Sequence, residues 1–148
     1  MNPLILNPMT VCEAGIAAYI SSSINSMSAS VYTGMDNEDR LPPAITVFCQ
    51  SANEVVFNSR NYEFDVNITV KEMAADSTLT DYSTLAGNVL AYFTDSMIGS
   101  QALSQYCQGN GIGINIYQIR ISGYNQETMG DTWINNFNFK FIGALVPV

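Results

Sequence analysis

The sequence predicts an α+β fold, in which a mostly antiparallel sheet has two helices packed on one face. Three observations carry this prediction. Residues 61–71 alternate between polar and apolar side chains without an error, which is typical of a strand with one buried face. Two other segments repeat apolar residues at helical spacing. The remaining strands come in adjacent runs, so the expected order is α-β-β-α-β-β.

The composition indicates one domain with few charges on its surface. A chain of 148 residues suffices for one hydrophobic core, so we predict a single domain over residues 1–148. Charged residues make up 12% of the chain, about half the usual share. Such a surface is completed by uncharged polar side chains or covered by neighbouring subunits. The net charge of −8 argues against gripping nucleic acid, although nucleic acid could slide past such a surface.

The first expected helix runs from Pro8 to about Ser28. Asn7 suits the N-cap, and Pro8 suits the first helical position. One face repeats an apolar residue every four positions, at Cys12, Ile16, Ile20 and Ile24. This spacing predicts an amphipathic helix.

The next strands form an antiparallel pair. Pro42-Pro43 excludes a helix and opens a strand from Ala44 to Gln50. A turn is expected at Ser51-Ala52-Asn53, and a short strand could follow at Val55–Phe57. The central strand then runs from Asn61 to Lys71. Its apolar side chains are Tyr62, Phe64, Val66, Ile68 and Val70, and its polar ones include Glu63, Asp65, Asn67 and Thr69.

The second helix is expected from Tyr82 to Phe93, where apolar residues recur at spacings of three and four. Thr80 or Asp81 could cap its start, and it should end near Asp95. Gly87 lowers helix stability, so we expect it to mark close packing on the sheet or on a partner. Residues 98–108 are ambiguous between a short helix and irregular structure.

The last part of the chain is expected to be a hairpin. Residues 109–113 contain three glycines but lack the lysine and spacing of a phosphate-binding loop, so a turn is predicted. The alternation that follows changes phase at Ile116-Tyr117, which predicts a bulge or burial on both faces. A loop from Ser122 to Asp131 should lead into a last strand, Trp133 to Leu145, with odd positions inward.

No set of residues favours catalysis. The chain has no His, which removes the commonest general base and metal ligand. Glu63 and Asp65 share one strand face, but alternating acids on such a face are usually plain surface, so we assign them to a lumen or solvent face. Cys107 lacks a His partner. Cys12, Cys49 and Cys107 are odd in number and widely spaced, which fits reduced thiols. We expect no enzyme activity, no metal site and no cofactor.

The connection from Val31 to Pro43 has a charged tip, formed by Met35, Asp36, Asn37, Glu38, Asp39 and Arg40. Connections of this length are often functional. Two interpretations stand side by side: a solvated turn, or an arm that docks on a neighbouring subunit.

Residues 1–9 contain no basic leader, and no run of about 18 apolar residues exists to span a membrane. We therefore expect a soluble, unexported protein without membrane contact.

The layout resembles that of the tail terminator proteins of long-tailed bacteriophages. The resemblance covers most of the chain: the first helix, the strand that follows Pro43, the central strand 62–70, the helix 82–93 and the closing hairpin 112–146. It implies an α+β subunit that assembles as a hexameric ring on the tail tube protein and meets head-completion or neck proteins. It also implies assembly in the host cytoplasm, location in the virion, and DNA that passes through without specific binding.

Two other interpretations remain open. The chain could be another virion ring protein, either a head-completion protein or a tail tube subunit. It could also be a small acidic binding module that uses the loop 35–40.

Overall fold

The computed structural model describes residues 7–23, 29–34, 41–55, 59–73 and 79–146, without the side chains of residues 79–84. The elements of the described residues are α1 (Pro8–Ser23), β1 (Ser30–Thr33), β2 (Ala44–Glu54), β3 (Asn61–Met73), α2 (Leu79–Thr94), α3 (Ser96–Gly109), β4 (Ile114–Met129) and β5 (Thr132–Leu145). The strands form one sheet in the order β1-β2-β3-β5-β4, in which only the β1–β2 pair is parallel. The predicted α+β class and the mostly antiparallel sheet are confirmed. Two elements, β1 and α3, join the expected order.

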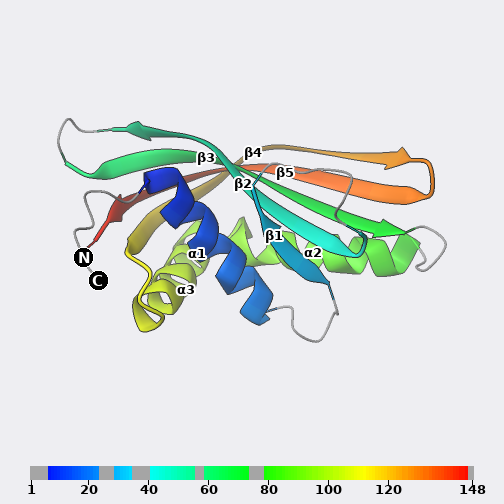
Figure 1. Cartoon of the computed structure of the whole chain (residues 1–148), viewed down its shortest axis with the longest axis horizontal. Coiled ribbons are helices and arrows are strands. Elements are labelled where there is room, and N and C mark those ends of the chain that lie inside the picture. The colour runs from blue at the N-terminus through cyan, green and yellow to red at the C-terminus, as the bar shows by residue number, and fades with distance from the viewer. Residues whose placement is uncertain (1–6, 24–28, 35–40, 56–58, 74–78, 147–148) are drawn as a thin grey trace.

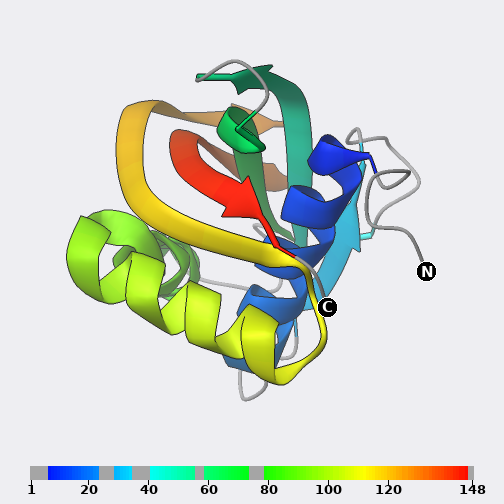
Figure 2. The same cartoon turned by 90° about the vertical axis from the view of Figure 1, so that its left-hand side faces the viewer.

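The helices lie on one side of a twisted sheet (Figure 1). Seen from the left-hand side of that view, the sheet curves around the helices, and α3 runs beside β4 (Figure 2). The helices touch one another through aromatic rings, with Tyr19 of α1 against Tyr92 and Phe93 of α2 and Tyr106 of α3. One apolar core therefore fills the space between the sheet and the helices.

The central strand is confirmed as β3, which pairs antiparallel with β2 on one side and β5 on the other. Its even positions face the helices, and Phe64, Val66 and Ile68 have no exposed surface. Burying each such side chain contributes roughly 1.5–3 kcal/mol before entropy is subtracted. Phe93 of α2 meets two rings of β5 edge-on, with centroids 5.5 Å away, and these rings belong to Phe139 and Phe141.

Helix α1 begins where the sequence predicts. The Oδ1 atom of Asn7 accepts the N–H of Met9 at 2.9 Å, so Asn7 caps the helix and Pro8 occupies its first position. The described part of the helix reaches Ser23, and the predicted continuation to Ser28 falls on residues 24–28. Residues 24–28 lie outside the described part of the chain.

Two helices follow β3. Helix α2 ends at Thr94, as predicted, whereas its expected caps at Thr80 and Asp81 have no described side chains. Asp95 caps the N-terminus of α3, which resolves the ambiguous segment 98–108 as a helix. Close packing of Gly87 on the sheet is contradicted, because a Cβ added there meets nothing within 4 Å in this chain; packing on a partner stays a prediction.

Two expectations around β2 need correction. The expected turn at residues 51–53 continues β2, which reaches Glu54 through a bulge between Cys49 and Ser51. Pairing with β3 holds this polar stretch in the sheet. The long connection before β2 begins with β1, a strand four residues long. The possible strand at Val55–Phe57 falls on a bend at Val55 and on residues outside the described ranges.

The closing hairpin is confirmed, but its turn is shorter and its first strand longer than predicted. The phase change at Ile116-Tyr117 is a bulge, as expected, because the register shifts between Ile116 and Gln118. The predicted loop 122–131 is wrong: β4 continues to Met129, and the turn lies at Gly130, whose φ is +59°. Residues 121–131 are all exposed, so no buried face imposes an alternating pattern there.

Candidate interaction surface

The sheet face opposite the helices carries the polar side chains of the sheet; we call it the open face. Register places on it the odd positions of β3 and the even positions of β5. Among the described residues, it holds three acids, three bases and a group of amides: Glu63, Asp65 and Glu127; Lys71, Arg120 and Lys140; and Asn67, Asn125, Asn136 and Asn138. The part of this face near Thr46 and Thr69 is buried, so its accessibility is not uniform.

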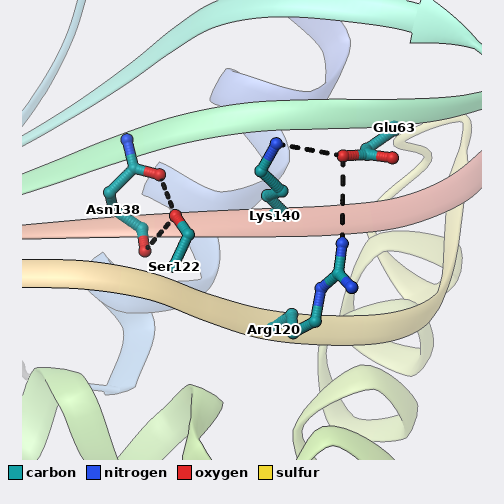
Figure 3. Close-up of polar contacts among 5 residues, drawn as sticks. All are labelled: Glu63, Arg120, Ser122, Asn138 and Lys140. Carbon is teal, nitrogen blue, oxygen red and sulfur yellow. Dashed lines mark hydrogen bonds and ion pairs between the residues drawn. The ribbon is translucent and has the colours of Figure 1, made fainter.

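Glu63 lies in a charge cluster that spans three strands (Figure 3). Its Oε1 atom is 3.2 Å from Nζ of Lys140 on β5 and 4.0 Å from a guanidinium nitrogen of Arg120 on β4. The side chains of Glu63 and Lys140 are 30% and 35% exposed, so water screens the pair and it adds only about 0.2–1 kcal/mol to stability. The two cations therefore offset the negative charge of Glu63 but contribute little to the free energy of folding.

Asp65 differs from its neighbour. Lys140 stands opposite it in β5, and Ser51 stands opposite it in β2. Its Oδ1 atom is buried and has no hydrogen-bond partner among the described residues. Both predicted acids therefore lie on the open face and are only partly exposed. Their assignment to a lumen stays a prediction.

Amides and hydroxyls form a network across three strands of the open face, β3, β5 and β4. Thr69 donates its hydroxyl to Oδ1 of Asn136 at 2.8 Å, and Asn136 donates to Asn125 at 3.0 Å. Nδ2 of Asn138 donates to Oδ1 of Asn67 at 2.6 Å. The hydroxyl of Ser122 donates to Asn138, as Figure 3 shows. An open hollow here is lined by Asn67, Gly123, Tyr124, Asn125, Asn136, Phe137 and Asn138.

The open face is therefore not predominantly acidic. Three carboxylates are balanced by three cations, and neutral amides lie between them. Sequence reasoning found the acids from the β3 alternation and missed the cations. Because Lys140 lies between the buried Phe139 and Phe141, the sequence shows that its side chain points away from the core. Its contact with Glu63 follows only from the register of β3 and β5.

The three cysteines are buried and reduced, as expected. The thiols of Cys12 and Cys49 are hydrogen-bonded to each other. Burial raises the pKa of Cys12 well above its usual value, and the hydrogen bond from Cys12 lowers the pKa of Cys49. Burial also raises the pKa of Cys107 to about 11, so this thiol stays protonated near neutrality.

The remaining site prediction is the loop formed by Met35, Asp36, Asn37, Glu38, Asp39 and Arg40. It lies outside the described residues. Within the described residues, no three His, Cys, Asp or Glu side chains gather in a way that could hold a metal ion. The described helices are also too short or too polar for any of them to cross a membrane.

Comparison with known proteins shows a shared fold. No protein-family model matches the chain, and no curated protein matches it. Among solved structures, a chain from "Virion of native gene transfer agent (GTA) particle" is similar with a TM-score of 0.54. The match covers 89% of this chain and 93% of that chain at 8% sequence identity. Most of the chain therefore shares its fold with nearly all of that chain.

Proposed function

We propose that this chain is a structural virion protein that forms a ring, most simply a hexamer, on the end of a phage-like tail tube. The ring would stop tube growth and join the tube to head-completion or neck proteins. The observation that carries the proposal is the likeness of fold, over nearly the full length of both chains, to a chain of a gene transfer agent virion. The resemblance to tail terminator proteins supports the particular position.

The open face suits a channel through which DNA passes without being held. Binding of DNA requires clustered Lys and Arg side chains that neutralise phosphates. Here each cation has a carboxylate on the same face, and Glu63 already engages Lys140 and Arg120. Amides between the charges offer hydrogen bonds but no net attraction. We therefore propose that DNA slides past this face without specific contacts.

A structural role is proposed in preference to a catalytic one. The sequence has no His, and the Cys107 thiol has a raised pKa that disfavours the nucleophilic thiolate. The carboxylate of Glu63 is occupied by two cations.

Two measurements test the proposal. The mass of the purified protein in solution, by light scattering, should be that of a closed ring alone or after addition of tail tubes. Electron micrographs of the mixture should then show a ring at one end of each tube. Continuous filaments would support a tube subunit, and a ring bound only to isolated portals would support a head-completion protein. A monomer that binds no tube would favour a small acidic binding module.

The loop at residues 35–40 gives a second test. If it docks on a neighbouring subunit, replacing Asp36–Asp39 by Gly-Ser-Gly-Ser should impair ring assembly. The urea midpoint of the subunit should stay unchanged, since the substitution keeps the length of the connection. Unchanged assembly would show that the loop is a solvated turn.

A further inference from the structure

Strand β4 is a long strand at the edge of the sheet, and its two halves differ. The half next to α3 is covered: the hydroxyl of Ser104 donates to the carbonyl of Ile116 and accepts its N–H, at 3.0 and 2.8 Å. The hydroxyl of Ser96 accepts the N–H of Ile119 at 2.9 Å. Serines of α3 thus bond to both outward backbone groups of Ile116 and to the N–H of Ile119.

Beyond Ile119 the edge is open. In an antiparallel strand, the residues whose N–H and C=O point outward recur at alternate positions. Ile116 and Ile119 stand opposite odd-numbered residues of β5, so later residues opposite odd numbers also point outward. These are Ile121, Tyr124, Gln126 and Thr128, and no described residue bonds to their outward backbone groups. We call residues 121–128 the free edge.

Two exposed apolar side chains, Ile121 and Tyr124, lie on the free edge, and others lie near it in the sequence of β4 or at the start of α3. Eight large hydrophobic side chains of the described residues are exposed, and six of them lie on β4 or at the start of α3: Met97, Ile98, Tyr117, Ile121, Tyr124 and Met129. Tyr124 is 71% exposed. Edge strands of monomeric proteins are commonly protected by Lys, Pro or strong bulges. The free edge has no Lys or Pro, and its bulge lies at one end, between Ile121 and Gly123, so residues 123–128 have none of these protections. An unprotected edge with apolar side chains is suited to strand addition.

We propose that a second copy of this chain pairs with the free edge, β4 against β4, antiparallel about a two-fold axis at Tyr124. The bulge between Ile121 and Gly123 leaves Ser122 outside the ladder. With Tyr124 of one copy opposite Tyr124 of the other, Gly123 stands opposite Asn125 of the second copy. Because Ser122 is skipped, Ile121 stands opposite Gln126. Each residue whose backbone N–H and C=O point outward therefore faces another such residue, and the two can exchange hydrogen bonds.

Charge selects this register. The next position outward from the axis places Arg120 of each copy opposite Glu127 of the other, on the open face of the joined sheet. Both side chains are exposed, and opposite charges directly across an antiparallel pair are stabilising. Moving the axis by one residue would place Glu127 opposite Gly123. The two-fold axis repeats the charge pair, so each interface contains it twice.

Such a pair closes on itself and does not propagate. The inference goes beyond the proposed virion role and rests on it only in expecting that copies of the chain meet. The pair would be the state of the free subunit in which its unprotected edge is covered.

Charge reversal tests the register. The single variants Arg120→Glu and Glu127→Arg each place like charges opposite one another, so the dissociation constant of the dimer, measured by sedimentation, should rise roughly tenfold. The double variant carries both reversals and should restore the original value, because opposite charges again face each other. Failure of the double variant to recover would overturn the proposed register.

A backbone variant tests the edge itself. Gln126→Pro removes an outward N–H while leaving the bonds to β5, and should abolish the dimer without lowering the urea midpoint greatly. Gln126→Ala keeps the N–H and is the matched control, with dimerisation unchanged. A protein that is monomeric at every concentration would overturn the pair, as would a dimer indifferent to Gln126→Pro. A Gln126→Pro protein that forms hexamers but no dimers would overturn the pair and leave the proposed virion role standing. Dimers that never form rings on tail tubes would support the pair and contradict the proposed virion role.

Discussion

Replacing Ser104 by Ala should destabilise the fold far more than the loss of one hydroxyl suggests. Ser104 is 6% exposed and Ile116 is 3% exposed, so water does not reach the groups that the hydroxyl serves. Its removal leaves both the N–H and the C=O of Ile116 without a partner, at a cost of about 1–3 kcal/mol for each buried group. The higher helix propensity of Ala recovers about 0.5 kcal/mol. We expect a net loss of about 1.5–5.5 kcal/mol.

Ser100 provides the control for this experiment. It is also buried in α3, but its hydroxyl donates at 3.1 Å to the carbonyl of Met97 in the same helix. Ser100→Ala should therefore change stability by less than about 1 kcal/mol. Urea denaturation of both variants measures the difference, and hydrogen exchange of the Ile116 amide should accelerate only in Ser104→Ala. Equal midpoints for the two variants would refute the account of how α3 covers the edge of β4.

Three further outcomes are expected. Gly87→Ala should stabilise the protein by up to about 1 kcal/mol, since the added Cβ meets nothing. Gly143→Ala should cost about 1–3 kcal/mol, because its Cβ would clash with the carbonyl oxygen of Asn115. Thermal melts that give the two variants equal stability would contradict this contrast. The pKa of Cys107 is raised to about 11 in the folded state, so the stability gained from its protonated form is complete below pH 9 and is lost as the pH rises through 11. Cys107→Ala should therefore flatten the pH profile of the urea midpoint between these two values. An unchanged slope in the variant would contradict the raised pKa. Replacing Glu63 and Asp65 together by Gln and Asn should change the free energy of unfolding by less than about 1 kcal/mol, because the Glu63 ion pair is screened; a loss of several kcal/mol in urea titrations would show that water does not screen it.

The sequence predicts elements best where burial imposes a period. Strand β3 keeps its alternation because every even position meets the core, and α1 begins at Asn7-Pro8 because its cap is a local hydrogen bond. The bulge at Tyr117 was predictable for the same reason: the buried set changes from Ile114 and Ile116 to Ile119.

Prediction failed where long-range pairing overrides local pattern. The distal half of β4 has both faces exposed, and pairing with β5 alone keeps it extended. Ser51 continues β2 because Asp65 lies across from it, which no local pattern reveals. The partners of Glu63 follow from the register of β4, β5 and β3, so the sequence alone does not reveal that Lys140 and Arg120 lie next to it.

The balance of charges on the open face has a consequence for how subunits approach one another. Among the described residues, three acids and three bases lie on this face. The charged side chains described elsewhere are five acids and one base, Glu13, Glu54, Glu72, Asp95, Asp131 and Arg60, so that part of the surface is net negative. At low ionic strength, where the Debye length reaches about 30 Å, most orientations of two colliding subunits repel each other. Collisions that present the open faces, or the sheet edges bordering them, meet the least repulsion, so the long-range field itself would favour encounters in which the sheets meet.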